Sequence, residues 1–165
     1  FTSRLTRNLR EDKGYTYSPG SGTTWVMGGG FWSFNADVTA ADTGPALRET
    51  FMEIRRLQDE VPPQSEGDSI RSWLSGVFVL QNASTGGLIG QLANRDLWHL
   101  PDDYLDSYVP NILAVSDADI SRMASEYLPL DRMVLVLVGD LAVIGDDIRA
   151  LPELRDAQFI TAAQD

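Results

Sequence analysis

The spacing of apolar residues along the chain predicts a largely helical protein. Leu5 and Leu9 lie four residues apart among polar neighbours, which indicates the last turns of an amphipathic helix that ends at Gly14. Apolar residues further along recur at intervals of three and four, and they predict helices at about 42–61, 65–97, 100–112, 116–127 and 146–151. The polar stretch at 81–87 contains two glycines, so the 65–97 pattern is predicted to be two helices joined by a turn.

Alternating residues that are β-branched or aromatic predict a small number of strands. Two strands, at 15–26 and 31–39, flank Gly28-Gly29-Gly30 and should form a hairpin. The uninterrupted apolar run at 133–138 predicts a central strand buried on both faces, and a terminal strand is expected at 158–161. Early and late strands with helices between them predict an α+β fold, in which helices pack on one face of an antiparallel sheet.

Length and composition narrow the class of protein. The 165 residues, 43% of them apolar, are enough for one sizeable core, so we expect a single domain over residues 1–165. The formal net charge of -11 argues against binding to nucleic acid or to an anionic membrane, because no basic stripe offsets it. There is no cysteine, and no apolar run approaches the roughly 18 residues of a membrane span. These features do not decide the compartment, which is either the bacterial periplasm or cell envelope or the cytoplasm.

The sequence shows no recognised motif for a self-contained zinc or nucleophile site. An inverted zinc motif needs two histidines four residues apart, but the only histidine is His99, which we expect to be structural. Phosphate-loop, dinucleotide and cysteine-nucleophile motifs are also absent, and Asp140 after Gly139 is best explained as a turn. The acidic residues at 49–60 alternate with arginines, which predicts a solvated helix face rather than paired catalytic carboxylates.

The stretch from Asn8 to Ser18 concentrates the candidate chemistry. Arg10 falls on the last turn of the first predicted helix, and Tyr17 falls in the strand expected after Gly14, so their side chains could face one space. The spacing alone is explained equally by a plainer interpretation, in which Arg10 lies at a solvated helix end and Tyr17 lies on the face of a strand. An arginine can also donate a forked pair of hydrogen bonds to a peptide, and a tyrosine hydroxyl can stabilise a developing oxyanion.

This stretch resembles the "LRE(x)nGxxY" signature of the C-terminal, non-zinc half of pitrilysin/insulinase-type zinc metallopeptidases, the inverzincins related to mitochondrial processing peptidase. The likeness covers roughly the whole chain, with further matches at Phe1-Thr2-Ser3-Arg4-Leu5, in the acidic helix before Pro62-Pro63, at Leu100-Pro101-Asp102-Asp103-Tyr104 and at Met133-Val134-Leu135-Val136-Leu137-Val138-Gly139-Asp140. The resemblance implies a metallohydrolase half of the mitochondrial-processing-peptidase/LuxS-like type, with its first strand and helix missing. Because Phe1 also stands inside a predicted helix, we expect a fragment of a larger chain.

What the resemblance implies about function centres on Arg10 and Tyr17, which in that family project toward the active site of the other half and help hold the substrate peptide. The implied role is a substrate-binding, catalytically incomplete domain that closes over peptides and assists a zinc site in another domain or subunit. Its partners would be a peptide substrate and a zinc-bearing homologous domain or subunit, while this chain would hold no cofactor or metal itself. The alternative is a non-catalytic scaffold or assembly subunit with the same fold.

Overall fold

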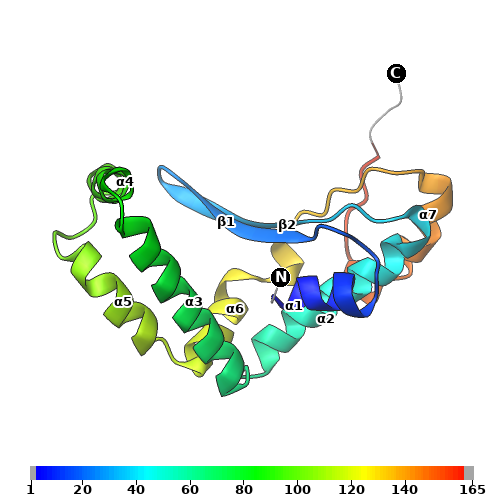
Figure 1. Cartoon of the computed structure of the whole chain (residues 1–165). Helices are drawn as coiled ribbons and strands as arrows, with labels where there is room; N and C mark the ends of the chain where they lie inside the picture. Colours follow the sequence, from blue (N-terminus) through cyan, green and yellow to red (C-terminus); the bar gives the residue numbers. More distant parts are fainter. Residues whose placement is uncertain (1–2, 162–165) are drawn as a thin grey trace. The chain divides into compact units, whose positions relative to one another are not determined.

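The computed structural model describes residues 3–161, which fall into two compact units (Figure 1). The first unit joins residues 3–56 to residues 124–161, and the second comprises residues 57–123. The described part of the chain is mostly helical and contains one two-stranded antiparallel sheet, so the predicted α+β class is confirmed. The single domain stays a prediction. Phe1 and Thr2, which belong to one of the matching motifs, lie outside the described residues.

The first unit contains the sheet and a helical layer built from both ends of the chain. Its first helix changes from α-helical to π-helical geometry. The boundaries between the two units fall inside two helices, α2 and α6, so each of these helices has residues in both units. The elements of this unit are α1 (Arg4–Thr6), the π-helix η1 (Arg7–Asp12), β1 (Gly20–Val26), β2 (Gly29–Asn35), the 3-10 turn η2 (Ala40–Asp42), most of α2 (Thr43–Asp59), the end of α6 (Asp117–Tyr127), η3 (Leu130–Arg132), α7 (Leu141–Arg149) and η4 (Pro152–Leu154).

Buried apolar side chains in the first unit come mainly from η1, α2 and α7. Leu9 has no exposed surface, and Phe51 and Ile54 lie three residues apart on α2. Ile144 and Ile148 lie four residues apart on α7. Burying a side chain of this size contributes about 1.5–3 kcal/mol relative to leaving it exposed, so these stripes hold the helices of the unit together.

β1 and β2 form the hairpin predicted from the glycine cluster, but both strands are shorter than predicted. Gly28 has a φ of +85°, a conformation that favours glycine over residues with a side chain. The register runs from Val26 opposite Gly29 to Gly20 opposite Asn35. The predicted strand start at residue 15 and end at residue 39 are wrong, because pairing stops at Gly20 and Asn35 and neither flank has a strand opposite it among residues 3–161.

The predicted central strand at 133–138 is also wrong. Among residues 3–161 no strand pairs with this segment, and Val134, Val136 and Val138 are 89%, 76% and 98% exposed. An apolar run supplies side chains that suit a buried strand, but a strand also needs a neighbour that satisfies its backbone groups. Residues 158–161, which were predicted to form a strand, are coil and likewise have no strand to pair with in the described part of the chain. The helix predicted at 146–151 is α7, which begins and ends earlier in the chain than predicted.

The second unit is a group of helices that agrees with the sequence pattern. It comprises α3 (Gln64–Asn82), α4 (Thr85–Leu97), α5 (Tyr104–Ala114) and the start of α6. The predicted turn between two helices is confirmed, because α3 and α4 are separate and the Ser84 hydroxyl accepts a hydrogen bond from the Gly87 amide at 3.0 Å. Phe78 of α3 stacks on Tyr108 of α5 with ring centroids 4.0 Å apart, which joins these two helices.

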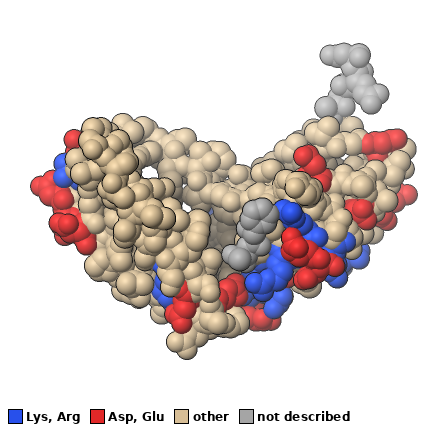
Figure 2. Space-filling view, in the orientation of Figure 1, with Lys and Arg blue, Asp and Glu red and all other residues tan. Residues whose placement is uncertain are grey.

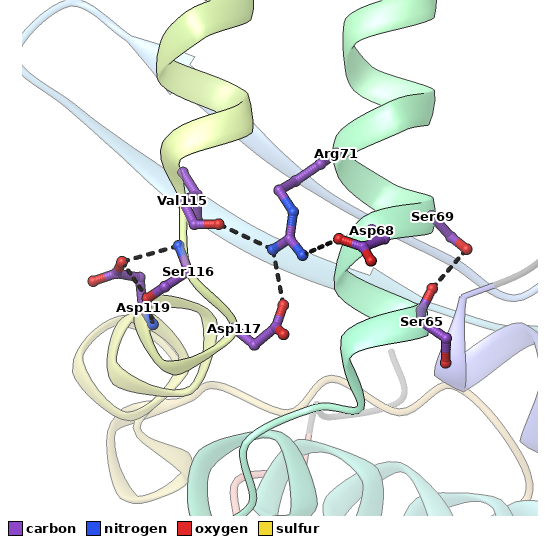
Figure 3. Close-up of polar contacts among 8 residues, drawn as sticks. All are labelled: Ser65, Asp68, Ser69, Arg71, Val115, Ser116, Asp117 and Asp119. Carbon is purple, nitrogen blue, oxygen red and sulfur yellow. Dashed lines mark hydrogen bonds and ion pairs between the residues drawn. The ribbon is translucent and has the colours of Figure 1, made fainter.

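A polar network joins α3 to the start of α6 within this unit (Figure 3). The Arg71 guanidinium donates to Asp68 Oδ1 at 2.6 Å, to Asp117 Oδ1 at 2.8 Å and to the Val115 carbonyl at 2.9 Å. The hydrogen bond with Asp68 and then the one with Asp117 raise the pKa of Arg71, so the guanidinium stays charged. One side chain thereby connects three segments of the unit.

The sequence Ser116-Asp117-Ala118-Asp119 is typical of a capping box, and the structure has one at the start of α6 (Figure 3). The Asp119 amide donates to the Ser116 hydroxyl oxygen at 3.1 Å, and the Ser116 amide and hydroxyl donate to Asp119 Oδ2 at 3.1 and 2.6 Å. These bonds, led by that of the Ser116 hydroxyl, lower the pKa of Asp119. Reciprocal capping of this kind satisfies backbone donors that have no partner inside the helix.

Candidate functional site

The candidate site is built on the turn that closes the π-helix η1. The Lys13 amide donates to the Asn8 carbonyl at 3.0 Å, a bond five residues long, and the Tyr15 amide donates to the Leu9 carbonyl at 2.8 Å. Gly14 takes a φ of +68°, as predicted for the residue that ends this helix. The wide π turn and the left-handed glycine reverse the chain, so that the residues after Gly14 return beside the helix they have just left.

This reversal brings Arg10 and Tyr17 together. The Arg10 guanidinium carbon lies 4.5 Å from the centroid of the Tyr17 ring, within the range of a cation–π contact. The Tyr17 side chain is 77% exposed, and Arg10 Nε also lies 3.2 Å from Glu11 Oε1. Tyr17 stands in a bend instead of the predicted strand, yet the two side chains do share one space. Their role in binding substrate stays a prediction.

A buried polar cluster lies next to this turn and was not predicted. The Asn8 side-chain amide is buried and donates to Glu49 Oε2 at 2.9 Å and to Glu53 Oε1 at 2.8 Å. Arg56 Nη1 approaches Glu53 at 3.3 Å, and Lys13 Nζ approaches Glu49 at 3.6 Å. The cluster ties η1 to α2, since Asn8 precedes the two glutamates by more than 40 residues.

The cluster corrects one part of the expectation that the acidic residues at 49–60 form a solvated helix face, because Glu53 is buried, whereas Asp59 and Glu60 are exposed as predicted. Glu53 is only 7% exposed, and its Oε1 accepts the hydrogen bond from the Asn8 side-chain amide. The i, i+4 spacing of the two glutamates was a usable signal, but the partner on η1 was not visible in the local pattern. Acidic and basic atoms lie side by side over α1 and α2 in the space-filling view (Figure 2).

Other candidate residues have structural explanations. His99 lies in the turn after α4 with a φ of +52°, and its amide donates to the Asp96 carbonyl at 3.3 Å. Asp140 caps α7, since its Oδ1 accepts from the Ala142 amide at 2.9 Å. Within residues 3–161 no three histidine, cysteine, aspartate or glutamate side chains are grouped as a metal site would need. No helix in that same range combines the length and apolar character required to cross a membrane.

Comparison with known proteins finds similarity to the inactive domains of one peptidase family. Residues 1–72 match the family described as the peptidase M16 inactive domain. The structure is similar to the crystal structure of a peptidase M16 inactive domain from Pseudomonas fluorescens, with a TM-score of 0.68 and 25% sequence identity. That likeness covers 77% of this chain and 30% of the Pseudomonas chain, so the present chain spans less than half of it. A comparison with curated proteins found no match. The resemblance stated from the Asn8–Ser18 signature is thereby confirmed: residues 1–72 match the peptidase M16 inactive domain, and the fold is similar to that of a solved inactive domain.

Proposed function

We propose that this chain is the substrate-binding, catalytically incomplete domain of a zinc metalloendopeptidase. In this proposal it closes over a peptide that is held against a zinc site in another domain or subunit. The contact between Arg10 and Tyr17 carries the proposal, because the wide turn of η1 presents an arginine and an exposed tyrosine on one surface. The match of residues 1–72 to the peptidase M16 inactive domain supports it.

The two side chains have different tasks in this proposal. The Tyr17 hydroxyl donates a hydrogen bond to the oxygen of the scissile carbonyl as negative charge develops there. The Arg10 guanidinium binds a peptide carbonyl or carboxylate with its planar pair of donors, which a lysine cannot reproduce. Stacking of Arg10 on the Tyr17 ring keeps both groups oriented before a peptide arrives, which reduces the entropy lost on binding.

The chain by itself should neither bind zinc stoichiometrically nor cleave peptides. It has a single histidine and no cysteine, so the ligands of a peptidase zinc site must come from elsewhere. Calorimetric zinc titration of the isolated chain and a fluorogenic-peptide assay test this expectation. A tight one-to-one zinc site together with peptide cleavage by the isolated chain would overturn the proposal that the zinc site lies in another domain or subunit.

The decisive experiment uses the complete enzyme with its zinc-bearing half. Tyr17→Phe should lower kcat by about 10- to 1,000-fold, the range found when one oxyanion donor is removed, without changing zinc content. Arg10→Lys should raise KM more than it lowers kcat, because charge is kept and the planar fork is lost. Tyr127→Phe is the matched control, since Tyr127 is also exposed and lies on α6.

A scaffold or assembly role is the second candidate, and one observation favours it. Arg10 already contacts both Tyr17 and Glu11, so the pair has a structural explanation that involves no substrate. Under this alternative, Tyr17→Phe and Arg10→Lys leave steady-state kinetics at the wild-type level. Either variant would then change only the stability of the turn, which calorimetric melting measures independently.

A further inference from the structure

The π turn of η1 is closed twice, once by its backbone and once by side chains. The Lys13 amide donates to the Asn8 carbonyl at 3.0 Å, and a hydrogen bond of this five-residue length is the one that defines π-helical geometry. The side chains of the same two residues meet on one carboxylate of α2. Glu49 Oε2 accepts from Asn8 Nδ2 at 2.9 Å, and Glu49 Oε1 lies 3.6 Å from Lys13 Nζ. Glu49 thus bridges the two ends of the turn.

This bridge depends on the register of the turn. In an α-helix of 3.6 residues per turn, residues five apart lie about 140° apart around the axis. That rotation would direct the Lys13 side chain away from the face that holds Asn8. A turn closed by a five-residue hydrogen bond instead brings the two residues onto one face, where one carboxylate can contact both.

The two halves of the bridge differ in burial and therefore in strength. Asn8 is 8% exposed and the Glu49 side chain is 19% exposed, whereas the Lys13 side chain is 42% exposed. A hydrogen bond from a buried amide to a carboxylate is stronger than an ion pair that water screens. The Asn8 bond therefore anchors η1 on α2, and the Lys13 contact favours the π register of the anchored turn.

The register of η1 also determines where Arg10 and Tyr17 lie. Arg10 lies inside the bridged turn. The Tyr15 amide donates to the Leu9 carbonyl at 2.8 Å, so the chain that leads to Tyr17 leaves from the same turn. The contact of 4.5 Å between the Arg10 guanidinium carbon and the centroid of the Tyr17 ring therefore joins two segments that the π turn holds in place.

We propose that Glu49 is a positioning residue, which sets the Arg10 guanidinium against the Tyr17 ring by holding both ends of the π turn from α2. Its action is indirect, because it passes through Asn8 and Lys13. The consequence for peptide cleavage rests on the proposed function of Arg10 and Tyr17, whereas the effect on their contact does not.

The test replaces Tyr17 by 3-fluorotyrosine in the complete enzyme and records the fluorine NMR signal, which responds to a cation stacked on the ring. Arg10→Ala supplies the reference signal of an unstacked ring. Glu49→Gln keeps an acceptor for Asn8 but loses the charge that faces Lys13, so the signal should move toward that reference. Lys13→Met should move it equally, and the two substitutions together should move it no further, because both break one link. A signal at the wild-type position in Glu49→Gln would overturn the proposal.

Glu53→Gln is the matched control, since it is the same chemical change in the same cluster. Glu53 Oε1 accepts from Asn8 Nδ2 at 2.8 Å but pairs with Arg56, and a glutamine oxygen can still accept that hydrogen bond. The fluorine signal should therefore stay at its wild-type position. An equal displacement in Glu53→Gln would assign the effect to the charge of the whole cluster instead of the bridge, which would also overturn the proposal.

Steady-state kinetics of the complete enzyme separate this inference from the proposed function. Glu49→Gln should lower kcat/KM by about 10- to 100-fold, the loss that accompanies a misplacement of about 1 Å. It should add no loss to a variant that already carries Tyr17→Phe and Arg10→Lys, and an added loss there would contradict an action through these two residues. Wild-type kinetics in Tyr17→Phe and Arg10→Lys would refute the proposed function, while the fluorine signal would still decide the role of Glu49.

Discussion

Asn8→Asp is the substitution that should most directly disturb the turn carrying Arg10. The Asn8 amide donates both of its hydrogens to carboxylates on α2, at 2.9 Å to Glu49 and 2.8 Å to Glu53. An aspartate has nearly the same shape, but at neutral pH it has no donor and adds a third negative charge. The variant thus changes electrostatics and hydrogen bonding with little change in volume.

The size of the effect follows from the burial of the cluster. Hydrogen bonds to charged groups contribute about 1.5–3 kcal/mol each, so losing two of them costs about 3–6 kcal/mol. The Glu49 side chain is 19% exposed, so water recovers part of that loss, and Asn8→Ala should cost about 3–4 kcal/mol. Asn8→Asp should cost more, because each nearby carboxylate adds a repulsion of about 3 kcal/mol at roughly 5 Å and an effective dielectric constant of about 20.

Urea unfolding followed by circular dichroism measures these differences. The Asn8→Asp penalty should be largest at pH 7 and should shrink toward about pH 4, because protonation removes the added charge and restores one donor. Asn111→Asp is the matched control, since it places the same charge on an exposed position of α5. An Asn8→Asp variant within about 0.5 kcal/mol of wild type at pH 7, or a penalty that grows on acidification, would refute the reasoning.

Three further predictions concern local features. Gly14→Ala should cost about 1–2 kcal/mol in urea unfolding because of the positive φ alone, while Gly22→Ala, with no such backbone requirement, should cost less. Arg71→Lys should speed amide exchange in α3 and α5 without affecting the first unit, because the three-way hydrogen bonding requires a planar guanidinium. Ser116→Ala should raise the pKa of Asp119 toward its ordinary value, as measured by NMR titration. The low pKa of Asp119 makes its stabilising contribution full above the ordinary carboxyl pKa and lost as pH falls through the lowered one. The difference in melting temperature between wild type and Ser116→Ala should therefore shrink in acid to the part due to the lost hydrogen bond from the Asp119 amide to the Ser116 hydroxyl.

Features that depend on neighbouring residues were predicted well from the sequence. The capping box of Ser116 and Asp119, the break between α3 and α4, and the helix end at Gly14 each involve groups only a few residues apart. Their conformations follow from side-chain hydrogen bonds or from the freedom of glycine, which do not require the rest of the fold. The contact between Arg10 and Tyr17 is local in the same way, because one turn separates the two residues, whereas their role was implied by the family resemblance and stays a prediction.

Features that depend on distant partners could be decided only by the tertiary structure. Glu53 was predicted to be solvated because its charge and its arginine neighbours are typical of an exposed helix, yet Asn8 buries it from 45 residues away. The run at 133–138 has the composition of a central strand, but among residues 3–161 it has no strand to pair with. Side-chain composition determines what a segment can bury, whereas burial and strand pairing also require a second segment, whose position is set by the packing of the whole chain.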